Sequence, residues 1–249
     1  MTDRPRALIT GGAKRVGRAT ALSLARAGCD CLLTYRTSED EARQTADDLR
    51  DLDRSADLLR LDLDDPGSLD RLAESVLASG RLDILVHNAS IYHPTPLEEL
   101  TLDAAERLMR INALAPLLLT ARLAPLLRAS SMPGGGSVVC MADIHAMGRP
   151  RTDFAAYSMS KAALVEMVRS LARDLAPRVR INAVAPGVVA WPEEGHESDE
   201  ESQRAYLKRV PLARPGAPED AAEAVRWLAL DATYTTGQVI RIDGGRFLA

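Results

Sequence analysis

The chain of 249 residues is long enough for one large domain with a substantial core, and its 46% hydrophobic content is ordinary for a globular protein. A net charge of −4, without a block of lysines or arginines, argues against nucleic acid as a partner. We expect neither a signal peptide nor a membrane span, and therefore a cytoplasmic protein. Cys29, Cys31 and Cys140 lack paired spacing and the four histidines are scattered, so free thiols and no metal are expected.

Strand-like and helix-like segments alternate from one end of the chain to the other. Strands are expected at 6–10, 29–35, 56–63, 82–90, 136–143, 179–186 and 238–243. Helices are expected at 15–28, 38–52, 66–80, 101–130, 154–176 and 218–231, with a bend near Pro116 in the longest. The strands are continuous apolar runs, which is typical of parallel strands covered by helices on both faces. We therefore expect a single α/β domain over 1–249, a doubly wound, Rossmann-type parallel sheet of seven strands.

An acidic, irregular segment follows the sixth strand, in "VVAWPEEGHESDEESQR" at 188–204. Long loops without regular structure in compact domains are often active-site lids. We therefore expect 188–210 to act as a lid over a substrate cleft.

Glycines join the first strand to the first helix in "ITGGAKRVGRAT". Gly11 and Gly17 allow a sharp turn close to a pyrophosphate, which the free N–H groups at the helix start would bind, with Lys14, Arg15 and Val16 around it. The spacing differs from G-x-G-x-x-G, and an ordinary strand-to-helix turn is the alternative. The position at the first crossover favours a dinucleotide site.

The end of the second strand bears on the choice of cofactor. NAD-binding folds usually carry Asp or Glu there, to hold the ribose hydroxyls. Here the stretch is "TYRTSED", and Arg36 and Ser38, with Arg15 and Lys14, would surround a 2′-phosphate. Solvated surface groups are the alternative, but the set favours NADPH over NADH. Asp62, after the third strand, would bind the adenine amino group or begin the next helix.

Tyr157 and Lys161 are four residues apart in an expected helix and so share one face. A phenol has a pKa of about 10, and a neighbouring ammonium would lower it, so the tyrosine could exchange a proton nearer to neutral pH. A tyrosine packed over a lysine stem is the common alternative.

Motifs along the chain place this pair in context: "TGGAKRVG", "HNAS", "RINALAP", "YSMSK" and "RINAVAPG" occur in that order. In this respect the whole chain resembles the short-chain dehydrogenases/reductases. The resemblance implies that Tyr157 donates a proton, that Lys161 binds the nicotinamide ribose and lowers the tyrosine pKa, and that Asn112 helps to hold a relay water. It also implies a set of residues along the cofactor: Asn88, Ala89, Ser90, Pro186 and Gly187.

Asp143 departs from that family, which mostly has a serine at this position to bind a substrate carbonyl. A carboxyl group instead suits a nitrogen heterocycle with an amino group. The chain is similar here to the pteridine reductase subgroup, which has an Asp–Tyr–Lys set. That resemblance implies that Tyr92 stacks on a pterin and that Ser90 contacts it. Trp191 would cap the pocket or pack at the root of the lid.

The expected function is NADPH-dependent reduction of a pterin, namely dihydrobiopterin, dihydromonapterin or dihydrofolate, by hydride transfer to a ring C=N bond. Asp143 could also merely end a strand, which leaves open a carbonyl reductase of the same fold. An idle NADPH-binding regulatory module is the alternative from another class. The family resemblance implies a homotetramer.

Overall fold

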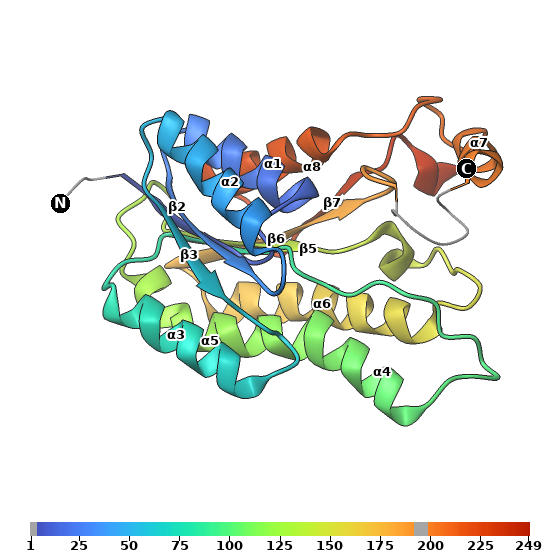
Figure 1. The fold of residues 1–249 in the computed structure, drawn as a ribbon, viewed down its shortest axis with the longest axis horizontal. Helices are drawn as coiled ribbons and strands as arrows, with labels where there is room; N and C mark the ends of the chain where they lie inside the picture. Colours follow the sequence, from blue (N-terminus) through green and yellow to red (C-terminus); the bar gives the residue numbers. More distant parts are fainter. Residues whose placement is uncertain (1–3, 192–198) are drawn as a thin grey trace.

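Seven parallel strands form one sheet in the order β3-β2-β1-β4-β5-β6-β7 (Figure 1). The structure, a computed structural model, describes residues 4–191 and 199–249. The strands are β1 (Arg6–Ile9), β2 (Asp30–Tyr35), β3 (Ala56–Arg60), β4 (Ile84–His87), β5 (Gly136–Met141), β6 (Val179–Pro186) and β7 (Val239–Ile242). The predicted doubly wound, Rossmann-type parallel sheet is confirmed.

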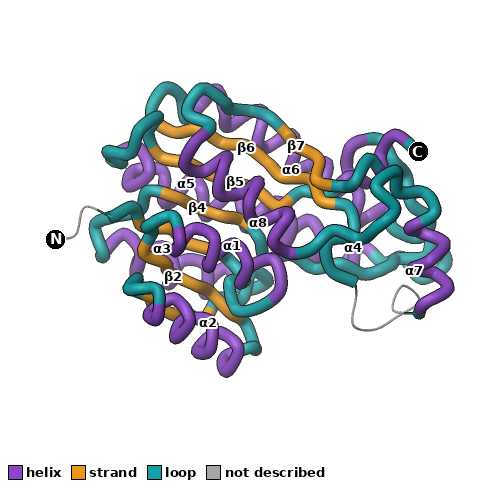
Figure 2. The backbone as a smooth tube through the Cα atoms, turned by 90° about the horizontal axis from the view of Figure 1, so that it is seen from above, coloured by secondary structure: helices purple, strands orange, loops and turns teal. Residues whose placement is uncertain are grey.

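Helices cover both faces of the sheet, as seen from the side in Figure 1 and from above in Figure 2. One face carries α1 (Arg15–Arg26), α2 (Glu39–Asp51) and α8 (Pro218–Arg226). The other carries α3 (Pro66–Ala78), α5 (Ala115–Arg128) and α6 (Ala155–Asp174), and α4 (Leu102–Met109) packs against α6 on the same side. Successive strand residues alternate between the two cores, so Leu8 packs with α3 and α5 while Ile9 packs with α1 and α2.

The strand order reverses between β1 and β4, which are neighbours although β2 and β3 come between them in the chain. Loops that leave the carboxyl ends of these two strands turn to opposite faces, and a crevice opens at such a switch point. The loops after β1, β4, β5 and β6 meet at this edge. The fold alone therefore predicts where a ligand would bind.

The longest predicted helix, 101–130, contains an irregular turn that the sequence did not reveal. A π-helical turn, Arg110–Leu114, separates α4 from α5, so the distortion lies just before Pro116 rather than at it. Pro116 has no N–H group, so the hydrogen-bond register can change there without losing a donor. Leu102–Arg128 is long and apolar enough to span a membrane by composition, yet 56% of its most apolar window is buried in the protein, as in a core helix.

Other boundaries also differ from the prediction. Helix α7 (Glu200–Leu207) begins inside the segment predicted to be irregular, 188–204, and 192–198 of that segment lie outside the described residues. The Asp199 carboxylate caps α7 by accepting from the Ser202 N–H at 2.9 Å. The helix buries no residue, so it lacks the apolar face by which helices are recognised in a sequence. The predicted helix 218–231 likewise ends in a π-helical turn, Trp227–Asp231.

Candidate active site

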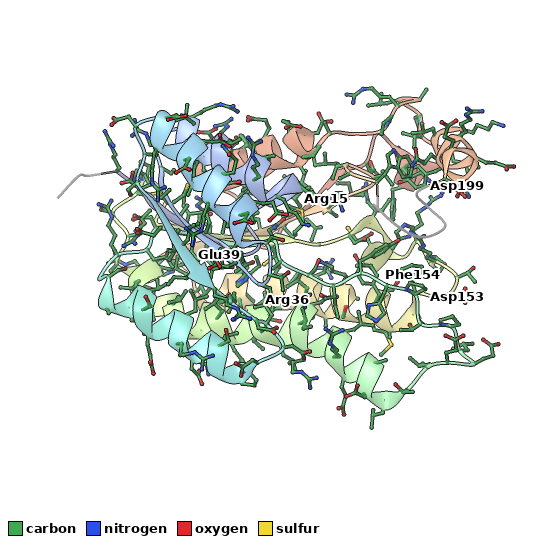
Figure 3. All side chains as sticks on the ribbon, in the orientation of Figure 1. Arg15, Arg36, Glu39, Asp153, Phe154 and Asp199 are labelled. Atoms are coloured by element: carbon green, nitrogen blue, oxygen red, sulfur yellow. The ribbon has the colours of Figure 1, made fainter. Side chains whose placement is uncertain are left out.

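A cleft of about 700 Å³ follows the carboxyl edge of the sheet. Arg15 and Arg36, both labelled in Figure 3, extend from the loops after β1 and β2 at this edge. Most of the predicted site residues line the cleft: Gly11, Lys14, Arg15, Val16, Gly17, Arg36, Ser38, Asp62, Asn88, Ala89, Ser90, Tyr92, Asp143, Tyr157, Lys161, Pro186 and Gly187. Asn112 and Trp191 lie outside this lining.

The glycine loop is shaped for a close backbone approach. Gly11 has φ +63°, in the left-handed region that favours glycine. A Cβ atom at Gly17 would lie 2.0 Å from the Gly11 carbonyl oxygen, so no other residue fits there. The Asn88 amide donates to the carbonyl oxygens of Thr10 and Gly11, each at 3.0 Å. Asn88 therefore fixes the loop to the end of β4 by its side chain.

The start of α1 fits a phosphate group. Within the described chain, no side chain caps this helix end, and its first turn contains no acidic residue. Helix N-termini leave unpaired N–H groups and carry partial positive charge, which anions satisfy. Lys14 and Arg15 are exposed beside this end. The residues present thus fit the pyrophosphate of a dinucleotide.

The ribose end of the cleft carries Arg36 and Ser38. Arg36 is exposed, and Ser38 starts α2 without a side-chain cap bond. The first turn of α2 is acidic, but Glu39 there is paired with Arg43 at 2.5 Å. Asp62 does not cap the next helix, because Asp65 occupies that position. Asp62 instead lines the cleft, and its Oδ1 accepts from the Asp64 N–H at 3.0 Å.

Asp143 faces the predicted proton donor. The Tyr157 hydroxyl donates to Oδ2 of Asp143 at 2.7 Å. The other oxygen, Oδ1, accepts from the His145 backbone N–H at 2.7 Å and caps a short 3₁₀ turn at Ile144–Met147. Both oxygens are held, so this carboxylate is oriented toward Tyr157 rather than into solvent.

Lys161 lies one turn further along α6 and is 2% exposed. Its ammonium donates to the Met141 carbonyl oxygen at 2.8 Å, and Nζ lies 6.0 Å from the centre of the Tyr157 ring. Burial lowers the pKa of Lys161 to about 8, although the charge of Asp143 opposes the shift. This ammonium therefore loses its proton at mildly alkaline pH, well below the range of an exposed lysine.

The predicted fall in the tyrosine pKa is wrong for this arrangement. Burial raises the pKa of Tyr157 well above its ordinary value, and both the charge of Asp143 and the hydrogen bond to it act in the same direction. Lys161 does not offset these effects, because its ammonium points at Met141, whereas the carboxylate contacts the phenol directly. Tyr157 consequently keeps its proton at neutral pH and remains available as a donor.

Asn112 lies in the π-helical turn and is 1% exposed. Its amide donates to the Ile91 carbonyl oxygen and to Ser160 Oγ, each at 3.0 Å, and its oxygen accepts from the Ile91 N–H at 2.9 Å. Asn112 thus ties the loop after β4 to α6, next to Tyr157. Asn112 is therefore a buried residue that holds the walls of the cleft in place without lining it. π-Turns occur frequently at functional sites, which agrees with this placement.

An aromatic cluster at the catalytic end includes residues that sequence reasoning missed. Tyr92 stacks on Phe154 with ring centres 4.8 Å apart and meets Tyr157 edge-on at 4.9 Å. The Arg151 guanidinium lies 4.2 Å from the centre of the Phe154 ring. Phe154, labelled in Figure 3, and Arg151 come from the loop before α6. The only feature of the sequence that could have pointed to Arg151 and Phe154 is their position a few residues before Tyr157.

Trp191 packs at the root of the predicted lid. Its ring meets Tyr206 of α7 edge-on at 5.5 Å. The carbonyl oxygens of Ala190 and Trp191 accept from Arg15 Nη2 at 3.1 and 2.8 Å. Tyr206, which sequence reasoning also missed, lines the cleft instead, and its hydroxyl accepts from the Val188 N–H at 3.3 Å.

The cysteines take no part in the cleft. Cys29, Cys31 and Cys140 are free and buried. Burial raises the pKa of Cys29 and of Cys140 to about 12, so both thiols stay protonated and unreactive. Across residues 4–191 and 199–249, no group of three or more His, Cys, Asp or Glu side chains is arranged to hold a metal ion.

Comparison with known proteins identifies the class. The model of the family described as enoyl-(acyl carrier protein) reductase matches residues 11–246. An uncharacterised oxidoreductase of Mycobacterium tuberculosis is 38% identical, over 96% of this chain and 90% of that protein. The 3-oxoacyl-[acyl-carrier-protein] reductase of Synechocystis is 31% identical, over 96% and 95%.

Comparison with solved structures points to the same class of protein. Acetoin dehydrogenase from Enterobacter cloacae superposes with a TM-score of 0.87 at 32% identity, over 99% of this chain and 96% of that one. A blue fluorescent protein from a metagenomic library, in complex with NADPH, superposes with a TM-score of 0.89 at 33% identity, over 98% of both chains. The chain belongs to the short-chain dehydrogenase/reductase family and is an oxidoreductase of that family.

Proposed function

We propose that this protein is an NADPH-dependent reductase of a C=N bond in a pterin, with Tyr157 as the proton donor. The observation that carries the proposal is the 2.7 Å hydrogen bond from the Tyr157 hydroxyl to Asp143. It puts a carboxylate, rather than a hydroxyl group, beside the donor in the cleft.

The chemistry of the carboxylate favours a substrate with N–H groups. An ionised carboxylate only accepts hydrogen bonds, and a ketone oxygen also only accepts. The two would repel each other, most strongly while negative charge builds up on the oxygen during reduction. A pterin carries amino and ring N–H groups, which can donate to Asp143 while a ring nitrogen accepts the proton of Tyr157.

The preference for NADPH rests on the cations of the cleft. Arg36 and Ser38 would hold the 2′-phosphate, with Lys14 and Arg15 beside the helix start. Arginine binds phosphate through two parallel hydrogen bonds, and no acid stands at the end of β2 to repel it. When bound, the reduced nicotinamide supplies the hydride.

The residues of the chain supply the proton. Tyr157 donates it to the ring nitrogen from its hydroxyl, and Asp143, held by the His145 N–H, would take up a proton from solvent and pass it on to the phenolate. Lys161 offsets the charge of that phenolate while its ammonium is protonated. Asn112 fixes the spacing of these groups through Ile91 and Ser160. Tyr92 and Ser90 would hold the pterin ring.

Further expectations belong to the same proposal. Segment 188–210 would act as a lid, because Val188, Val189, Ala190 and Tyr206 all line the cleft. We expect a homotetramer from the family resemblance and a cytoplasmic location from the composition of the sequence.

A carbonyl reductase is the second candidate, and the comparisons favour it. The relatives include a 3-oxoacyl-[acyl-carrier-protein] reductase and, at 32% identity, a glucose 1-dehydrogenase of Gluconobacter oxydans. Both names describe reactions at a carbon–oxygen bond. The alternative from another class, an idle NADPH-binding module, is disfavoured because the chain keeps Asn112, Tyr157 and Lys161, and turnover of any substrate would eliminate it.

Oxidation of NADPH by the purified protein separates these functions. We expect consumption with dihydrobiopterin or dihydromonapterin, inhibition by methotrexate, and much slower consumption with β-keto esters such as ethyl acetoacetate. Faster reduction of the keto esters would replace the first candidate by the second.

A further inference from the structure

His145 brings an imidazole ring to the catalytic end of the cleft. The residue lines the cleft together with Asp143 and Tyr157. The proposed chemistry uses only its backbone N–H, which donates to Oδ1 of Asp143 at 2.7 Å. The ring itself is left without a role, although an imidazole is the side chain that enzymes most often use to transfer protons.

One edge of the His145 ring is fixed by its own loop. Nδ1 lies 2.9 Å from the Arg149 carbonyl oxygen. A carbonyl oxygen only accepts hydrogen bonds, so Nδ1 carries a proton and donates it. The left-handed backbone of Gly148, with φ +96°, lets the chain turn back toward the ring at this point. The Arg149 guanidinium also donates to the Phe247 carbonyl oxygen at 3.4 Å, which holds the loop against a second segment.

The opposite edge of the ring, at Nε2, is open. Nδ1 is the ring nitrogen of His145 that is hydrogen-bonded within the described part of the chain. With one proton held at Nδ1, Nε2 of the neutral ring is an acceptor, and it can take up a second proton and release it without any change at Nδ1. His145 is half-buried and Gly148 is exposed, so the ring lies on the stretch of chain that leads from Asp143 to the solvent.

Asp143 requires a source of protons in every cycle. Its Oδ2 accepts from the Tyr157 hydroxyl and its Oδ1 from the His145 N–H, so protein groups occupy both oxygens. Bound cofactor and substrate would fill the cleft in front of this pair. The imidazole ring belongs to the residue whose backbone nitrogen contacts the carboxylate, so it stays near enough for a water molecule to connect them.

The other side chains at this end of the cleft are less suited to carry protons to Asp143. The Lys161 ammonium is turned to the Met141 carbonyl oxygen, to which it donates at 2.8 Å. Arginines such as Arg151 do not give up their proton in proteins. Burial raises the pKa of Tyr206, so its hydroxyl keeps its proton. Of the described residues that line this end, His145 fits the task best.

We propose that the His145 ring carries protons from solvent to Asp143 between turnovers. In each cycle Tyr157 gives its proton to the substrate and becomes a phenolate. Protonated Nε2 of His145 releases its proton through a bridging water to Asp143, which passes it to the phenolate and is again a carboxylate. The neutral ring then takes up another proton from solvent, so one proton enters for each hydride transferred.

This route rests on Tyr157 and Asp143 as the proton pair of the proposed function. It does not depend on the choice between a pterin and a ketone, because a ring nitrogen and a carbonyl oxygen would both draw their proton from Tyr157. His145 thus acts through Asp143 and does not itself touch the substrate.

His145→Asn tests the route, because it separates the two edges of the ring. The asparagine amide can replace Nδ1 as the donor to the Arg149 carbonyl oxygen, but nothing replaces Nε2. We expect kcat to fall about tenfold or more, measured as NADPH oxidation with whichever of dihydrobiopterin and ethyl acetoacetate the wild-type protein reduces. A single turnover, with enzyme in excess over substrate, should keep its rate within about twofold, because Tyr157 starts the cycle protonated.

A second variant and a control complete the experiment. His145→Ala removes the whole ring and leaves space for free imidazole, which should raise kcat of this variant and leave that of the wild type unchanged. His93→Asn is the matched control, since this half-buried histidine lies outside the cleft lining, and its kcat should equal that of the wild type.

The outcomes separate this inference from the proposed function. An unchanged kcat in His145→Asn would show that the ring only holds its loop, and an equal fall in the single-turnover rate would show that it acts on the chemical step. Either result contradicts the inference while the reductase stands. Reduction of ethyl acetoacetate alone would contradict pterin reduction, and the same two rates with that substrate still decide the inference. Wild-type protein that reduces neither substrate would contradict both, because a module without turnover needs no proton route.

Discussion

The cofactor end and the catalytic end of the cleft differ in how far their charged and polar side chains are exposed to solvent. At the cofactor end, Lys14, Arg15 and Arg36 are exposed cations on loops, set around backbone that only glycine can form. At the catalytic end, Tyr157 and Lys161 are 4% and 2% exposed, and each makes a short hydrogen bond inside the protein.

The difference shows that proton transfer requires buried groups, whereas phosphate binding does not. Phosphate is bound adequately by hydrated cations, because both partners stay near water and the attraction is strong enough there. Proton transfer needs groups whose pKa values are moved, and burial is what moves them far. Perturbed pKa values are accordingly found at Tyr157 and Lys161.

The largest effect should come from removing the proton donor at the buried end. In Tyr157→Phe we expect kcat to fall by about 10²–10⁴, the range for loss of a general acid. The Kd for NADPH, measured by fluorescence titration, should change little, because the phenol is not part of the phosphate site. Tyr234→Phe, which removes a fully exposed hydroxyl, is the control. Full turnover in Tyr157→Phe would show that Tyr157 is not the proton donor and that the buried end of the cleft is not the catalytic end.

A smaller effect is expected at the exposed end. In Arg36→Asp we expect kcat/KM for NADPH to fall by about 10- to 100-fold, because a charged hydrogen bond is replaced by repulsion, while NADH is used as well as before or better. Arg50→Gln, which removes an exposed cation at the other end of α2 and outside the cleft lining, should leave the ratio of kcat/KM for NADPH to that for NADH unchanged. An unaltered preference in Arg36→Asp would show that these cations do not choose the cofactor.

The smallest effect is a pH dependence from Lys161, whose pKa is lowered to about 8. If its charge is needed, kcat/KM for NADPH should be constant below that pH and fall about tenfold per unit above it. Tyr157 keeps its proton over the same range, since its pKa is raised.

The stability of the fold should change in the opposite direction. Because the pKa of Lys161 is below the unfolded value of about 10.4, the unfolded chain binds more protons between these two pH values, and this group then makes folding more favourable as pH rises. Thermal unfolding across the range distinguishes lost charge from lost structure. A flat activity profile to pH 9.5 would show that the ammonium is not required.

The fold could be read from the sequence because its signals are local. Continuous apolar strands and alternating helices define a doubly wound sheet, and a glycine loop at the first crossover marks the binding edge. Because the carboxyl ends of parallel strands share one edge, residues as distant as Arg36 and Asp143 could be assigned to one cleft.

What could not be read depends on packing between distant segments. No residue of helix α7 is fully buried, so its sequence has no strong apolar face to recognise. The sequence does not show that Arg151 and Phe154 belong to the site, because they are brought there by packing against Tyr92, which lies on another loop. The rise in the pKa of Tyr157 comes first from burial and then from contact with Asp143 rather than Lys161, and spacing along a helix reveals neither.

The carboxylate beside the phenol is what separates a pterin reductase from a ketone reductase in this account. The most direct measurement is the ratio of kcat/KM for dihydrobiopterin to that for ethyl acetoacetate, in wild-type protein and in Asp143→Ser. We predict that the serine lowers the ratio at least about tenfold, by losing the acceptor for N–H groups and gaining a donor for the ketone oxygen. A ratio that stays the same or rises would contradict the assignment of Asp143, and the substrate class with it.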